Sequence, residues 1–214
     1  SRALIMVDVP FVSSSSLQAV MDGATRIMAE TGCQSVKLEG GARVAGTVAA
    51  LVGAGIPVVG HLGFTPQSVN TLGLRVQGRS EEAARTLLDD ALALERAGAW
   101  AVVLELVPSE LAAAISAELS IPTIGIGAGP DCDAQVQVWH DLLGLYEEFV
   151  PKHARQFRTL GAETRAALDE YAAAVVDGSF PTAANSSSMD AETLKNALRG
   201  SAGEAGGGVS GQPA

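Results

Sequence analysis

The sequence contains few cysteines and no long hydrophobic run. Cys33 and Cys132 are its two cysteines, and they form neither a CxxC pair nor a pattern of metal ligands. Isolated thiols of this kind are typical of a reducing compartment, so we expect a cytoplasmic protein. No apolar run reaches the roughly 18 residues of a membrane span, and the first residues lack the basic and apolar regions of a signal peptide.

Basic residues are also scarce relative to acidic ones. The chain has 14 Lys and Arg against 24 Asp and Glu, a formal net charge of -10. Proteins that bind nucleic acids usually carry a basic patch, because they neutralise backbone phosphates. The composition therefore disfavours a nucleic-acid partner, and an anionic ligand needs local positive charge or a metal. With 47% hydrophobic residues over 214 positions, the chain can form the core of one domain or at most two.

Short apolar runs alternate with stretches of helical periodicity along most of the chain. Strands are predicted at 3–7, 35–38, 56–60, 101–106 and 121–126, with a sixth around 136–139. Helices are predicted from about residue 17 to Gly32, at 42–51, through Leu87 and Leu94 to near Gly98, at 109–119, and around Leu168 and Val175. Such alternation indicates a parallel sheet, either open and doubly wound or closed as a barrel.

Polar residues at the predicted strand ends favour the barrel, because barrel enzymes place their chemistry at the carboxyl ends of several strands. These residues are Asp8, Lys37, Glu39, His61 and Glu105. We therefore predict a (β/α)8 TIM barrel. Such a barrel has eight strands and about 250 residues, so we expect the first one or two β/α units to be missing from this chain. The predicted catalytic domain spans 1–182, and the Ser-, Ala- and Gly-rich segment 183–214 is expected to be disordered.

Lys37 and Glu39 lie two residues apart on one predicted strand, so their side chains point to the same face. They form either an ordinary ion pair beside a glycine turn or a functional pair, one binding a substrate carboxylate and the other serving a metal. Asp8 ends the preceding strand and supplies a second carboxylate for magnesium, which binds carboxylate oxygens together with water and substrate. Alternatively, Asp8 caps the helix that follows it.

Glu105 is a lone carboxylate inside an apolar run, where burial costs several kcal/mol unless the group is paired or protonated. It is either a buried ion-pair partner or a general base for proton abstraction. His61 is either a ligand contact or a structural histidine. The glycines at 125, 127 and 129 are interpreted as a tight turn rather than a phosphate cradle.

Several short motifs together resemble the ketopantoate hydroxymethyltransferase family. They are DVPF at 8–11, VKLEGG at 36–41, GHLGFTPQSVN at 60–70, VQGR at 76–79, VLE at 103–105 and IPTIGIGAG at 121–129. The resemblance implies a (β/α)8 barrel, a cytoplasmic role in pantothenate synthesis, and a large homo-oligomer, a decamer in the family. It also implies Mg2+ as cofactor and 5,10-methylenetetrahydrofolate as co-substrate.

The same resemblance implies roles for individual residues. Asp8 is expected to bind magnesium and substrate, Glu39 to complete the metal site, and Lys37 to contact the substrate. Glu105 is expected to accept the proton, and His61 is a further candidate for substrate contact. The family's Asp-Ser pair on an earlier strand has no counterpart before Asp8.

Two other functions stay open from the sequence. One is a magnesium-dependent 2-oxo acid lyase of the phosphoenolpyruvate mutase and isocitrate lyase type, although such lyases are expected to use a catalytic cysteine loop. The other is an inactive fragment, because a barrel that lacks strands exposes sheet edges.

Overall fold

The computed structural model describes residues 3–11, 16–146 and 148–201. The chain divides into two compact units, Ser1–Thr159 and Leu160–Ala214. The boundary lies earlier than the residue 182 expected from the sequence, because the helix around Leu168 groups with the C-terminal segment rather than with the sheet. No helix of the described ranges is long and apolar enough to cross a membrane.

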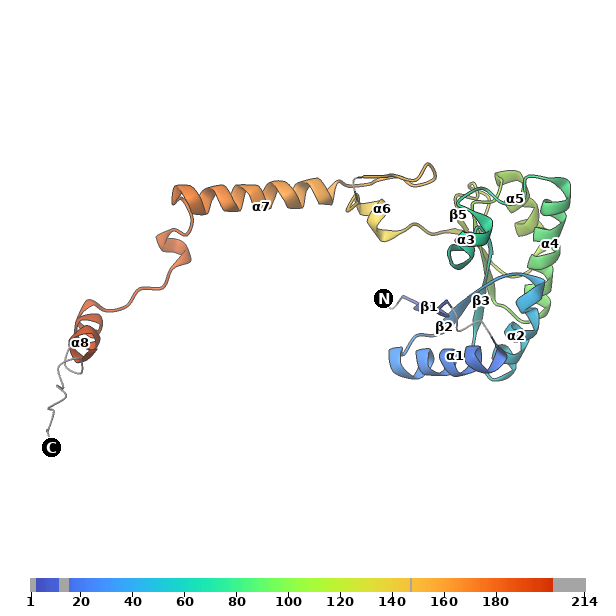
Figure 1. The fold of residues 1–214 in the computed structure, drawn as a ribbon, viewed down its shortest axis with the longest axis horizontal. Helices are drawn as coiled ribbons and strands as arrows, with labels where there is room; N and C mark the ends of the chain where they lie inside the picture. The colour runs from blue at the N-terminus through green and yellow to red at the C-terminus, as the bar shows by residue number, and fades with distance from the viewer. Residues whose placement is uncertain (1–2, 12–15, 147, 202–214) are drawn as a thin grey trace, which may run out of the picture. The chain divides into compact units, whose positions relative to one another are not determined.

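The first unit is built on a parallel sheet of six strands that pair in chain order (Figure 1). The strands are β1 (Met6–Asp8), β2 (Ser35–Glu39), β3 (Val58–Gly63), β4 (Ala101–Glu105), β5 (Thr123–Ile126) and β6 (Ala134–Gln135). Each strand pairs in parallel with the one before it. This sequential order is that of a (β/α) barrel and lacks the order reversal of a doubly wound sheet, so the predicted fold class is confirmed.

Two strand boundaries differ from the predictions. The first strand begins at Met6 rather than at residue 3, because the preceding Ile5 donates its backbone N–H to the side chain of Gln34 instead of to a strand. The sixth strand is Ala134–Gln135 rather than 136–139, since Trp139 already begins helix α6 (Trp139–Leu143). The short stretch Val-Gln-Val-Trp does not show where pairing ends and a helix begins.

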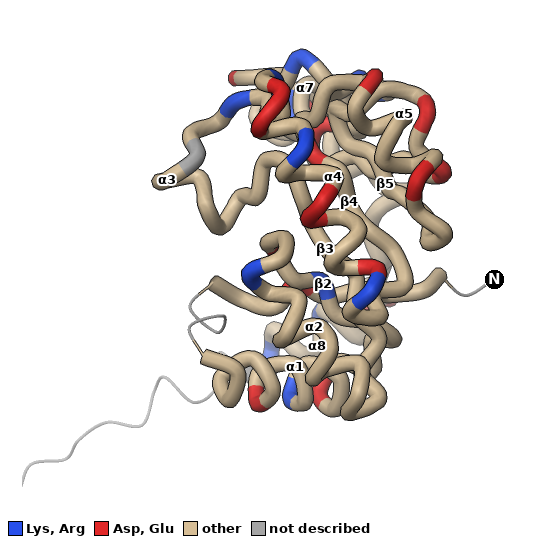
Figure 2. Tube along the Cα trace, turned by 90° about the vertical axis from the view of Figure 1, so that its right-hand side faces the viewer, with Lys and Arg blue, Asp and Glu red and all other residues tan. Residues whose placement is uncertain are grey.

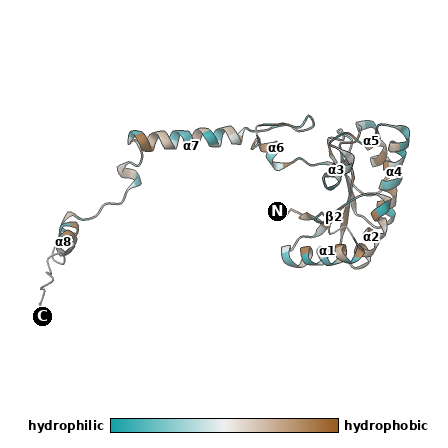
Figure 3. Ribbon diagram, viewed as in Figure 1, coloured by the Kyte–Doolittle hydropathy of each residue, from teal (hydrophilic) through white to brown (hydrophobic). Residues whose placement is uncertain are grey.

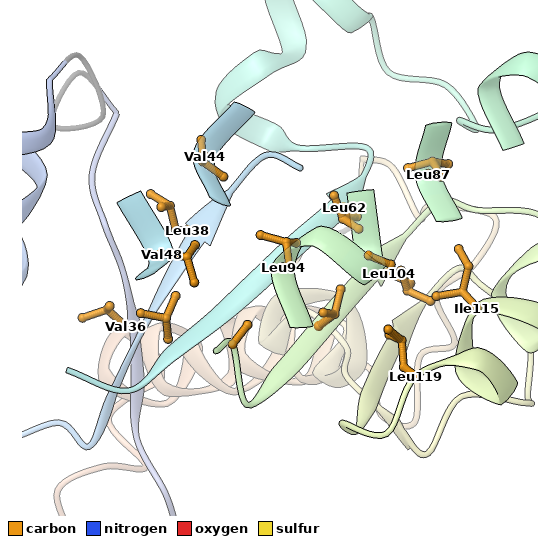
Figure 4. Packing of buried hydrophobic residues seen from close by; sticks show 14 of the residues in the cluster. Val36, Leu38, Val44, Val48, Leu62, Leu87, Leu94, Leu104, Ile115 and Leu119 are labelled. Carbon is orange, nitrogen blue, oxygen red and sulfur yellow. The ribbon is translucent and has the colours of Figure 1, made fainter. Parts of the chain in front are cut away.

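Four helices cover one face of this sheet (Figure 1): α1 (Leu17–Thr31), α2 (Ala42–Gly53), α4 (Glu81–Arg96) and α5 (Ser109–Glu118). Their apolar sides and the outward-pointing strand residues form the main core (Figure 4). Leu51, Leu94, Leu104 and Ile115 are among its largest fully buried side chains. Between β3 and α4 the chain forms the short helices η2 (Pro66–Ser68) and α3 (Val69–Leu72).

Helix caps fix where these helices begin. The Ser16 and Ser80 hydroxyls accept backbone N–H groups at the starts of α1 and α4, as expected for N-cap serines. Helix α2 starts after Gly41, which has no side chain to act as a cap. Its cap comes from another helix, because the Asp90 carboxylate on α4 accepts the Ala42 N–H at 2.7 Å.

The opposite face of the sheet, here called the inner face, carries a small apolar cluster of Val59, Ala101, Val103 and Ile126. Side chains alternate between faces along a strand. The residues two positions further on, His61 after Val59 and Glu105 after Val103, therefore share the inner face. The sheet thus delivers polar groups to its carboxyl end directly above this cluster.

The second unit consists of α7 (Leu160–Asp177), η3 (Ala183–Asn185) and α8 (Ala191–Ser201). Helix α7 has no buried residue, and its apolar C-terminal part, with Tyr171 and Val176, is exposed (Figure 3). Helices η3 and α8 lie within the segment 183–214 for which disorder was expected. Local hydrogen bonds to the side chains of Asn185 and Asp190 start these helices without any need for a core. Residues 202–214 lie outside the described part of the chain.

Candidate active site

The strand register gathers the five predicted polar residues at one edge of the sheet. Asp8 on β1 lies beside Lys37 on β2, and Glu39 lies beside His61 on β3. Glu105 on β4 lies beside Gly63, the residue two positions beyond His61. Neighbouring residues in paired parallel strands point to the same face. All five side chains therefore occupy the carboxyl end of the inner face, as the strand-end pattern predicted.

Lys37 joins two of its neighbours. Its Nζ lies 2.6 Å from Asp8 Oδ1 and 3.1 Å from His61 Nδ1. The Lys37 side chain is 14% exposed and that of Asp8 is 56% exposed, so the ion pair has a sheltered cation and an accessible carboxylate. An ammonium only donates hydrogen bonds, so Nδ1 of His61 is the acceptor and the ring hydrogen lies on Nε2.

His61 lies at the centre of the site and is 1% exposed. Its Nε2 lies 3.2 Å from Glu105 Oε2, but the two groups are not aligned for a hydrogen bond. Nε2 is thus a buried donor without a hydrogen-bond partner among the described residues, a state that costs about 1–3 kcal/mol. A small rotation of Glu105 or a bound ligand would satisfy this group.

Glu39 is buried, and its Oε2 accepts the backbone N–H of Gln67 at 3.0 Å. Burial raises the pKa of Glu39, while the hydrogen bond from Gln67 and the positive charge of Lys37 oppose that rise. The Gln67 side chain in turn donates to the Val9 carbonyl at 2.9 Å and links η2 to the end of β1. The sequence indicated no role for Gln67, although it lies within the GHLGFTPQSVN motif.

Glu105 ends β4 with a side chain that is 16% exposed, so it is less buried than its apolar neighbours suggested. The next residue, Leu106, adopts a left-handed backbone conformation with φ 49°. Such a conformation in a residue with a branched side chain costs of order 1–3 kcal/mol and needs support. Two hydrogen bonds support the backbone of Leu106: its N–H donates to the Ile126 carbonyl, and its carbonyl accepts the N–H of Gln77. Glu105 is therefore held at a fixed, strained strand end.

A cavity of about 810 Å3 opens beside this cluster. Glu39, His61 and Gln67 line it, together with Phe11 and Arg43, whereas Asp8, Lys37 and Glu105 do not. The predicted residues are therefore joined by contacts, and two of them face this cavity directly.

The donor set at the site suits a hard cation. Asp8 and Glu39 are carboxylates at the ends of adjacent strands, and magnesium combines one or two carboxylates with water and substrate oxygens. Within the described ranges no three His, Cys, Asp or Glu residues form a ready metal cluster. Asp8 and Glu39 are therefore the two carboxylates that these adjacent strand ends offer to such an ion.

Comparisons with known proteins extend the motif resemblance over most of the chain. The family model described as ketopantoate hydroxymethyltransferase matches residues 1–183. The 3-methyl-2-oxobutanoate hydroxymethyltransferase of Chloroflexus aurantiacus is 55% identical over 197 residues, covering 92% of this chain and 70% of that protein. The protein of the same name from Gluconacetobacter diazotrophicus is 54% identical over 198 residues, covering 92% and 72%. Among solved structures, oxaloacetate acetylhydrolase gives a TM-score of 0.43 at 14% identity, covering 95% of this chain and 71% of that one.

Proposed function

The chain belongs to the ketopantoate hydroxymethyltransferase family, and from this membership and the site geometry we propose how it converts 3-methyl-2-oxobutanoate to 2-dehydropantoate. The one-carbon donor is 5,10-methylenetetrahydrofolate, and the product enters pantothenate synthesis. The observation that carries the proposal is the line of contacts from Asp8 through Lys37 and His61 to Glu105.

Glu105 is proposed to accept the proton from C3 of the 2-oxo acid. The electrons of the C3–H bond move toward the keto oxygen and give an enolate. C3 then attacks the methylene carbon of the donor, and one carbon–nitrogen bond of the folate breaks. Water adds to this carbon as the second carbon–nitrogen bond breaks. The two folate nitrogens take up the proton from Glu105 and one proton from water, which leaves a hydroxymethyl group and tetrahydrofolate.

The other residues are proposed to bind and orient the substrate. Lys37 neutralises the substrate carboxylate, and Asp8, with its exposed carboxylate, limits where that anion can lie. The Nε2–H of His61 donates to the substrate or to the Glu105 carboxylate, because it has no hydrogen-bond partner among the described residues. Each role follows from a charge or donor already present at the strand ends.

Magnesium is proposed to be held by Asp8 and Glu39. When bound, it would supply positive charge that stabilises the developing enolate. Asp8→Asn is expected to weaken magnesium binding at least tenfold in a calorimetric titration with MgCl2. An unchanged dissociation constant would remove Asp8 from the metal site.

The proton-transfer step has a direct test. In heavy water, exchange of the single C3 proton collapses the methyl doublet of 3-methyl-2-oxobutanoate into a singlet in the proton NMR spectrum. Glu105→Gln is expected to slow this magnesium-dependent exchange about 100-fold or more, the usual contribution of a general base. Glu118→Gln, an exposed position on α5, is the matched control. Full exchange in Glu105→Gln would rule out Glu105 as the base.

The alternatives fare differently. The family match argues against a lyase, and both cysteines are buried, Cys33 at 5% and Cys132 at 8% exposure, unlike thiols of a catalytic loop. The inactive-fragment alternative predicts no exchange of the C3 proton by the chain with magnesium present.

We further propose a cytoplasmic homo-oligomer, a decamer as expected for the family. Light scattering on the purified chain would test the oligomeric state.

A further inference from the structure

A second cavity, of about 620 Å3, lies directly after the strand end that carries Glu105. Leu106, Val107 and Pro108 form one wall, and Gly127 and Gly129, which follow β5, form another. This volume is in the range of small-molecule sites. None of the described acidic residues lines the cavity.

The glycines keep this cavity open. Gly127 has φ 62°, and a Cβ there would lie 2.9 Å from Leu106 Cδ2 and 3.0 Å from His153 Cβ. Gly129 has φ 83°, and a Cβ there would lie 2.5 Å from Ser109 Cβ. Any side chain at either position would therefore strain the backbone and crowd the walls.

The cavity carries positive charge in an acidic protein. Arg79 and Lys152 line it with His153, whereas helices α4 and α5 carry acidic residues along the chain (Figure 2). Neither Arg79 nor Lys152 forms an ion pair with a carboxylate of the described residues. Uncompensated cations beside apolar walls favour a ligand that combines an apolar body with an anionic group.

The folate donor has this chemistry, since its aromatic p-aminobenzoyl group ends in a glutamate with two carboxylates. The wall residue Leu106 directly follows Glu105 in the chain, so the cavity begins at the strand end that carries the proposed base. We propose that this cavity binds the p-aminobenzoyl-glutamate part of the donor, with the aryl ring against Leu106 and Val107. Arg79 and Lys152 pair with the glutamate carboxylates. The inference rests on the proposed function.

The test compares two probes, tetrahydrofolate and the primary amide of tetrahydropteroate, which keeps the aryl amide but lacks the glutamate and both of its carboxylates. Calorimetric titration of the wild-type chain, with magnesium and 3-methyl-2-oxobutanoate present, is expected to give at least tenfold tighter binding of tetrahydrofolate. Arg79→Met and Lys152→Met keep an unbranched aliphatic side chain and remove its charge. Each is expected to weaken the binding of tetrahydrofolate about tenfold and that of tetrahydropteroate amide less than twofold. Arg96→Met, at the exposed end of α4, is the control.

The outcomes separate the two proposals. Equal affinity of the wild-type chain for both probes would overturn the cavity assignment without any need for a variant. Equal weakening of both probes in Arg79→Met would also overturn it, since charge removal should affect only the glutamate. Failure of the wild-type chain to exchange the C3 proton, a step that needs no folate, would instead overturn the proposed function.

Discussion

Lys37 Nζ and His61 Nδ1 lie 3.1 Å apart on adjacent strands, and this contact determines where the imidazole carries its hydrogen. The ammonium occupies the acceptor nitrogen, which leaves the hydrogen on Nε2, the atom that faces Glu105 at 3.2 Å. Lys37 thus determines that the single N–H of the His61 ring lies on Nε2, on the side of Glu105, the proposed base. The contact links the substrate binding proposed for Lys37 to the proton transfer proposed for Glu105.

Lys37→Met should release this constraint on His61. We expect kcat/KM to fall about 10- to 100-fold, because a charge-assisted hydrogen bond contributes about 1.5–3 kcal/mol. Nitrogen-15 NMR of the imidazole should show Nε2–H in the wild-type chain and a mixture of tautomers in the variant. An unchanged single tautomer in Lys37→Met would show that another group orients the ring.

The cap that α4 supplies to α2 predicts a coupled pair of substitutions. A Cβ at Gly41 would overlap the Asp90 carboxylate, so Gly41→Ala should cost about 1–3 kcal/mol of unfolding free energy. Asp90→Ala should cost about 1 kcal/mol through loss of the cap. Because both changes disrupt one contact, the double variant should lose less than the sum in urea denaturation.

Gly46→Ala is the matched control for this pair, because Gly46 lies in the same helix and an added Cβ there would have nothing within 4 Å. It should stabilise the protein by about 0.5–1 kcal/mol, since alanine favours the helix. Additive losses in the double variant would mean that Gly41 and Asp90 act independently.

Gln67→Leu should loosen the connection between η2 and the end of β1. The variant loses the hydrogen bond to the Val9 carbonyl, and we expect a loss of about 0.5–1.5 kcal/mol in urea denaturation. The backbone bond from Gln67 to Glu39 should survive. Gln18→Leu, which removes an exposed bond to Asp22 on α1, should change stability by less than about 0.5 kcal/mol. Equal effects of the two substitutions would contradict this role for Gln67.

Asp133 makes part of the stability depend on pH. Its carboxylate accepts the backbone N–H and the hydroxyl of Thr123, and these bonds lower the pKa of Asp133 from its ordinary value of 3.8. A lowered pKa stabilises the fold above pH 3.8, and this stabilisation is lost as the pH falls through the lower value of the folded state. The stability difference between wild type and Asp133→Asn should therefore shrink in urea denaturation from about pH 6 toward about pH 3. A constant difference would contradict this account.

Hydrophobic periodicity and the alternation of side chains along a strand were enough to predict the sheet and the common face of the site. Lys37 and Glu39 are two residues apart, and Asp8, His61 and Glu105 each lie near the end of an apolar run, so a parallel sheet brings them together. The contacts of Gln67 and Asp90 could not be predicted, because each crosses between elements far apart in the chain. Helix α8 was missed because composition suggested disorder, whereas its start depends on the local cap at Asp190.

Leu106, with its left-handed backbone, is connected to two parts of the proposed reaction, namely proton abstraction by Glu105 and binding of the folate donor. Its backbone holds Glu105 in place, and its side chain forms a wall of the cationic cavity. A substitution of Leu106 would disturb both the proposed base, Glu105, and the cavity proposed to bind the folate donor. Its effects on proton transfer and on folate binding could therefore not be separated. Attempts to adapt the protein to another one-carbon carrier should therefore leave residue 106 unchanged and begin at Val76 or Gln135, which also line this cavity.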